Sequence, residues 1–145
     1  MQPHYEITLT RPWHWGIAIV SGVGAVIPEQ RSGIVTATSS ALMIEVRHAS
    51  DVVFGEAEGE QPWATATILV RSLPALAEVP ADLLFTGDLS SPGGKLTIGD
   101  ADGGITIDGL AERTVVRVAG DASDPTGQDK IWIDLAPGVL PPNQL

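Results

Sequence analysis

Cysteine is absent from this 145-residue chain, and its absence excludes several classes of site at once. Without thiols there can be no disulfide framework, no cysteine nucleophile and no zinc site built from cysteine. The lack of disulfides is typical of a cytoplasmic protein. The chain is nevertheless long enough to bury a core without covalent or metal cross-links. We therefore expect one domain spanning residues 1–145, with no cofactor.

Basic residues are scarce: 8 Lys and Arg stand against 18 Asp and Glu, which gives a net charge of −10. The excess of acids lies after residue 50, because the first fifty residues carry three acids and three bases. Such a surface repels nucleic-acid phosphates and anionic lipids, so direct binding to either is disfavoured, whereas a basic protein would be attracted. The simpler interpretation, that the acids keep a turn-rich protein soluble, is the favoured one.

Long apolar runs are also missing. The longest candidate, Gly16 to Ile27, has only twelve residues, three of them glycine. A membrane-spanning helix needs about 20 apolar residues. No basic cluster precedes this segment, as a signal peptide would require. We expect neither a membrane span nor a targeting signal here.

The sequence contains 16 glycines and 11 prolines, which disfavour long helices. Many of its apolar residues alternate with polar ones. Apolar side chains recur at every second position in the C-terminal third of the chain, at Leu96 and Ile98, Ile105 and Ile107, Val116 and Val118, and Ile131, Ile133 and Leu135. Spacing of two places each set on one face of a strand. The pattern predicts an all-β protein, a two-layer antiparallel β-sandwich or a flattened barrel, with an antiparallel meander from Lys95 to Pro137 and at most one short helix within Ser72–Leu84.

Tryptophan occurs four times, and each lies in a predicted strand, with Trp63 at the start of the strand Trp63–Arg71. Trp13 to Val20 is predicted to be one central strand, so Trp13 and Trp15 would share a face, with packing in the core favoured for both. Trp132 alternates with Ile131 and Ile133, so it lies outside the sheet if these two face the core. An exposed tryptophan is a common interface anchor, although cover by a loop or by the second sheet is favoured.

Residues that could perform catalysis do not gather in any recognisable motif. The three histidines lack metal-ligand spacing, and the run Asp100–Gly104 begins like a calcium loop but lacks the later ligands, so it is interpreted as a hairpin turn. We therefore expect a protein that is not an enzyme and binds no metal. If it were a metal-dependent hydrolase, its ligands would come from the loop aspartates Asp100, Asp102, Asp108 and Asp124.

Three stretches of the C-terminal third, Gly104–Ile107, Arg113–Val118 and Ile133–Pro137, together with the opening Tyr5–Leu9, resemble the competence protein J family, also called the DNA-entry nuclease inhibitor family. The resemblance implies a small acidic β protein that binds and restrains a nuclease or toxin, as immunity proteins do. This agrees with the charge argument. A self-associating structural or accessory β protein, forming a homo-oligomer, is the alternative that the sequence leaves open.

For a basic partner, the sequence predicts a surface that combines two acidic groups with one aromatic anchor. Acids would give fast, salt-sensitive association, and a desolvated indole would slow dissociation. The predicted partner-binding residues are Glu56, Glu58, Glu60, Asp121, Asp124, Asp129 and Trp132.

Overall fold

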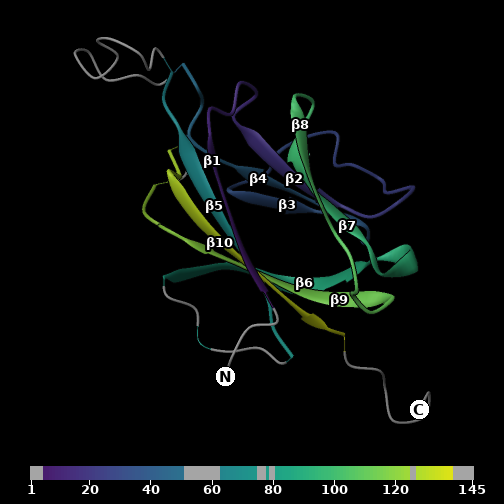
Figure 1. Cartoon of the computed structure of the whole chain (residues 1–145). Coiled ribbons are helices and arrows are strands. Elements are labelled where there is room, and N and C mark those ends of the chain that lie inside the picture. Colours follow the sequence, from purple (N-terminus) through teal and green to yellow (C-terminus); the bar gives the residue numbers. More distant parts are fainter. Residues whose placement is uncertain (1–4, 51–62, 75–77, 79–80, 125–126, 139–145) are drawn as a thin grey trace.

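Two five-stranded sheets pack face to face around one hydrophobic core in the computed structural model (Figure 1). The structure describes residues 5–50, 63–74, 78, 81–124 and 127–138. Within these ranges the regular structure is β-strand, apart from one 3₁₀ turn at Pro92–Gly94. The predicted all-β sandwich is confirmed. Neither described sheet closes into a barrel.

The first sheet is built around β10, which lies at its centre. Its strands, in spatial order, are β1 (Tyr5–Arg11), β5 (Ala66–Ser72), β10 (Lys130–Pro137), β9 (Arg113–Gly120) and β6 (Asp82–Ser90). Neighbouring strands are antiparallel except β5 and β10, which run parallel. This parallel pair is the one departure from the antiparallel pattern among the described strands.

The second sheet is antiparallel throughout its described strands. Its strands, in spatial order, are β3 (Val35–Ala37), β4 (Ala41–Glu45), β2 (Ile17–Ser21), β7 (Leu96–Asp100) and β8 (Gly103–Ile107). The first sheet is edged by β1 and β6, and the second by β3 and β8. In the described part of the chain, no helix has the length and apolar composition needed to cross a membrane.

The alternating apolar sets form the core, as the sequence predicts. Leu96, Ile98, Ile107, Val116, Val118, Ile131, Ile133 and Leu135 are all at most 2% exposed. The exception is Ile105, which is partly buried and packs against this core from the edge strand β8. Burial of branched side chains on the two facing sheets is the main source of stability in such a sandwich.

The predicted meander from Lys95 to Pro137 is wrong in its connection. β7 and β8 form a hairpin in the second sheet, whereas β9 and β10 form an antiparallel pair in the first. The chain therefore crosses between the sheets after β8. Alternation places a side chain on one face of its strand but does not say which sheet the strand joins, so the pattern could not show this crossing.

The connection from β6 to β7 also crosses between the sheets, and two glycines shape it. Gly93 and Gly94 both have positive φ, at 69° and 73°. Gly94 lies against the main chain of Leu110, which donates its N–H to the Gly94 carbonyl at 3.0 Å. A Cβ at Gly94 would collide with the Leu110 carbonyl oxygen, whereas one at Gly93 would point into open space.

Candidate functional site

Main-chain hydrogen bonds tie several loops together at one end of the sandwich. The carbonyl of Trp13 accepts from Gly16 and Ala49, the carbonyl of Gln128 accepts from Arg47, and the carbonyl of Ala49 accepts from Ala64, at 2.8–3.0 Å. We call this end the loop end. It comprises residues 13–16, 46–50 and 63–65, the β7–β8 turn at residues 100–103, and residues 121–124 and 127–129 between β9 and β10.

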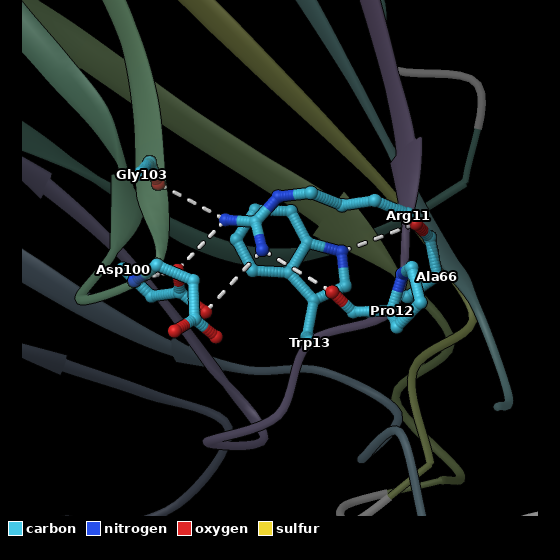
Figure 2. Close-up of polar contacts among 7 residues, drawn as sticks. Arg11, Pro12, Trp13, Ala66, Asp100 and Gly103 are labelled. Carbon is cyan, nitrogen blue, oxygen red and sulfur yellow. Dashed lines mark hydrogen bonds and ion pairs between the residues drawn. The ribbon is translucent and has the colours of Figure 1, made fainter.

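Arg11, the last residue of β1, links the two sheets at the loop end (Figure 2). Its guanidinium carbon lies 3.6 Å from the centroid of the Trp13 ring. Its Nη2 donates to Asp100 Oδ1 at 2.9 Å and to the Gly103 carbonyl at 3.1 Å, and the Asp100 side chain is only 1% exposed. The Trp13 Nε1–H donates to the Ala66 carbonyl of β5 at 3.1 Å. These contacts hold the β7–β8 turn against the first sheet.

The turn before β2 corrects the prediction of one continuous strand from Trp13 to Val20. Gly16 has a φ of 67°, and the strand begins only at Ile17, because this left-handed conformation turns the chain. Trp13 is fully buried as predicted, but Trp15 is 57% exposed, so the two do not share a face. Gly16, directly after the second tryptophan, was the signal in the sequence that could have indicated this turn.

Two exposed tryptophans at the loop end, Trp15 and Trp63, are not among the residues that the sequence predicted to bind a partner. Trp63 is 48% exposed, and its ring meets that of His14 edge to face at a centroid distance of 5.0 Å. Next to His14 opens a depression of about 580 Å³. It is lined by Arg11, Pro12, His14, Trp15 and Asp102.

The predicted turn acids Asp121, Asp124 and Asp129 all lie in the loop between β9 and β10, and buried Gln128 organises this loop. Its Nε2 donates to the carbonyls of Asp121 and Asp124, and its Oε1 accepts from the Asp121 N–H at 2.9 Å. Asp121 Oδ1 accepts from the Ser123 hydroxyl at 2.6 Å and from the Ser123 N–H at 2.9 Å. These bonds favour the carboxylate and lower the pKa of Asp121.

Trp132 lies on the outer face of the first sheet, since Ile131 and Ile133 are fully buried inside. The side of the sheet predicted for Trp132 is therefore confirmed. The indole is only partly exposed, between Leu69 of β5 and Ala119 of β9. Lys130 Nζ lies 4.9 Å from its ring centroid, so a side chain of the same strand already covers part of it.

An ion pair stands beside Trp132 on the same face. Arg71 donates Nε–H to Asp134 Oδ1 at 2.7 Å and Nη2–H to Oδ2 at 2.5 Å, and the Asp134 side chain is 1% exposed. Hydrogen bonding to this carboxylate, despite opposing desolvation, raises the pKa of Arg71. Two parallel charge-assisted bonds fix the side chains in one geometry across the parallel strands.

The remaining predicted acids form two groups, the glutamates of the predicted partner surface and the aspartates considered as metal ligands. Glu56, Glu58 and Glu60 lie outside the described residues. The four aspartates considered as metal ligands do not converge: Asp100 binds Arg11, Asp108 lies 3.8 Å from Lys95 Nζ beyond the far end of β8, and Asp124 accepts from the Gly127 N–H. Among the described residues, no group of three or more His, Asp or Glu side chains could hold a metal.

Comparison with solved structures identifies a protein of the same architecture over nearly the full length of the chain. The crystal structure of ComJ, the inhibitor of the DNA degrading activity of NucA from Bacillus subtilis, superposes with a TM-score of 0.59 over 94% of this chain and 98% of ComJ. The chain shares the fold of ComJ. The two sequences are 12% identical.

A second structure, that of the product of crocagin biosynthetic gene J, superposes with a TM-score of 0.49 at 14% identity, covering 92% of this chain and 96% of that one. No protein-family model and no curated protein sequence matches the chain. At 12% identity the likeness to ComJ extends to the fold and not to individual side chains. The chemistry of the loop end therefore rests on the residues of this chain alone.

Proposed function

We propose that this protein is a non-catalytic inhibitor of the immunity type, which binds a basic protein partner and restrains it, and that the partner is a nuclease. The observation that carries the proposal is the likeness to ComJ over 94% of this chain, since ComJ inhibits a DNA-degrading enzyme. The net charge of −10 supports it independently, because an acidic inhibitor is attracted to the basic surface with which nucleases hold DNA.

The partner-binding surface belongs to the same proposal. It combines Glu56, Glu58 and Glu60 with the turn acids Asp121, Asp124 and Asp129 and with Trp132. Complementary charges accelerate the encounter of two proteins, whereas buried apolar anchors slow their dissociation. Charge reversal at Glu58 and Asp124 should therefore slow association at low salt, and Trp132→Ala should speed dissociation at any salt.

The decisive experiment measures degradation of plasmid DNA by NucA with increasing amounts of this protein. We expect degradation to stop at a stoichiometric ratio, and the two proteins to elute as one complex on size-exclusion chromatography. A protein that leaves degradation unchanged even in large excess, and forms no complex, would refute the proposal.

The alternative of a self-associating accessory protein is tested with the same sample. Sedimentation velocity of the protein alone gives its oligomeric mass. A stable oligomer combined with no effect on the nuclease would favour self-association. A monomer that inhibits the nuclease would exclude it as the main function.

A further inference from the structure

We propose that the exposed aromatic surface at the loop end, made of His14, Trp15, Trp63 and Asp102, is where a lysine- or arginine-bearing segment of the basic partner docks. The inference rests on the proposed function and deepens it. It assigns the apolar anchor of the interaction to Trp15 and Trp63, at the end of the sandwich, in addition to the surface predicted around Trp132.

Exposure distinguishes these two tryptophans from the other two. Trp15 is 57% exposed and Trp63 is 48% exposed, whereas Trp13 is fully buried and Trp132 is partly covered by Lys130. The His14 ring, next to Trp15 in the turn, contacts Trp63 edge to face. Large aromatic side chains gathered at the surface mark an interaction site more often than they serve stability.

The depression beside these rings suits a cation. Asp102 and Trp15 both line it, and the exposed Asp102 carboxylate makes no hydrogen bond or ion pair with any described residue. The positive charge of Arg11 on the same wall is already neutralised by Asp100 at 2.9 Å. A lysine or arginine that enters would meet an aromatic face and a free carboxylate together.

The protein contains this arrangement once already. Arg11 lies over the Trp13 ring at 3.6 Å while its guanidinium binds Asp100 (Figure 2). Arg11 thus contacts one aromatic ring and one carboxylate of the loop end. The neighbouring pair, Trp15 and Asp102, exposes the same two kinds of group to solvent. The docking surface therefore repeats, for a partner's cation, a contact that the fold uses for its own.

The charges around this surface determine which sign of charge the partner must carry. The Ala64 N–H donates to the Ala49 carbonyl at 2.8 Å, which holds Trp63, the preceding residue, beside residues 46–50 of the loop end. Asp121 and Asp129 are exposed at the same end. An acidic protein or a nucleic acid would be repelled, and a basic segment attracted.

The four indole N–H groups allow a direct test, because each tryptophan gives its own resonance in a ¹⁵N-labelled sample. Single Trp→Phe variants assign the four signals. The probe is an acetylated peptide of alternating arginine and glycine, and its glutamate–glycine counterpart is the control. We expect the arginine peptide to shift the Trp15 and Trp63 indoles and to leave Trp13 and Trp132 unmoved. The glutamate peptide should shift none.

Substitutions then connect the surface to the partner. Trp15→Ala and Trp63→Ala remove exposed side chains, so the fold should tolerate them, and each should weaken nuclease binding by about tenfold. Asp102→Asn should weaken association mainly at low salt. The matched control is Thr106→Ala, which truncates an exposed side chain of β8 and should leave binding unchanged.

The outcomes separate this inference from the proposed function. Shifts confined to Trp132, equal shifts of all four indoles, or no shift at saturating peptide would overturn the docking surface. Inhibition of the nuclease that is unaffected by Trp15→Ala and Trp63→Ala would also overturn it and leave the proposed function standing. Selective shifts of the two indoles without nuclease inhibition would support the surface and remove the nuclease as partner.

Discussion

The ion pair between Arg71 and Asp134 allows a quantitative test of the outer face of the first sheet. Asp134→Asn removes the negative charge but preserves the size of the side chain and one acceptor oxygen. The Arg71 side chain, only 22% exposed, would then lose a charge-assisted hydrogen bond. Arg117 stands opposite Asp134 on β9, so the substitution leaves two cations flanking a neutral side chain.

The expected cost follows from the burial of the two partners. Removing one member of a fully buried pair costs about 3–5 kcal/mol. Arg71 retains some contact with water, and the asparagine oxygen can still accept one hydrogen bond, so we expect a loss of about 2–3 kcal/mol in the free energy of unfolding. With a urea m-value of about 2 kcal/mol/M, the unfolding midpoint should fall by about 1–1.5 M.

Urea denaturation followed by tryptophan fluorescence measures this change. The control is Asp88→Asn, which breaks the Asp88–Arg113 pair on the same face. That pair has one N···O contact at 2.9 Å, where Arg71 and Asp134 make two at 2.5 and 2.7 Å, and its side chains are 37% and 60% exposed. Its loss should cost less than about 1 kcal/mol. Equal effects of Asp134→Asn and Asp88→Asn would refute the argument from burial.

A double variant provides a second check. Arg71→Met combined with Asp134→Leu replaces the ion pair with apolar side chains of similar size, and such replacements are often neutral or stabilising. We expect the double variant to unfold within about 1 kcal/mol of the wild type. If the double variant lost as much free energy of unfolding as the two single substitutions together, breaking the ion pair would not be the source of the lost stability.

Three further predictions concern the loop end and the crossing between the sheets. The side chain of Asp121 should titrate below the ordinary range of aspartate by NMR, and Ser123→Ala should raise its pKa. Because the folded pKa lies below the unfolded one, the stabilisation from this carboxylate is present above about pH 4 and is lost as the pH falls through the folded value. Trp13→Phe loses a buried hydrogen bond and ring volume, and should cost about 2 kcal/mol in urea, so a cost near zero would contradict the described packing. Gly94→Ala should destabilise by more than about 2 kcal/mol, whereas Gly93→Ala, with the same positive φ but open space, should cost only about 1 kcal/mol, and equal costs would rule out the proposed collision.

Alternation in the sequence predicted the core because it reports directly on burial. Ile131, Ile133 and Leu135 recur at spacing two on a pleated strand, so one face of β10 had to be apolar. The same pattern placed Trp132 on the opposite face. What it could not supply is the partner of each strand, since the pairing of β10 with β5 joins residues about sixty positions apart.

The loop end shows where local patterns fail. Trp13 and Trp15 have strand spacing, yet Gly16 turns the chain and separates a buried tryptophan from an exposed one. The contact between His14 and Trp63 joins residues about fifty positions apart, and neither segment contains a sequence pattern that indicates it. Gathering of side chains from different loops follows from the tertiary fold, so no window of sequence contains it.

The central place of β10 has a consequence for how the protein acquires its fold. β1 and β5 on one side, and β9 and β6 on the other, meet only through this strand, and it follows all four of them in the chain. A ribosome makes those two halves first, and their inner edges stay open until residues 130–137 emerge. Pairings between residues so distant in sequence form slowly, because a large loop must close before any contact is made. The first sheet therefore cannot assemble during most of synthesis, and the open edges of β5 and β9 are the places where a nascent chain would aggregate or recruit a chaperone.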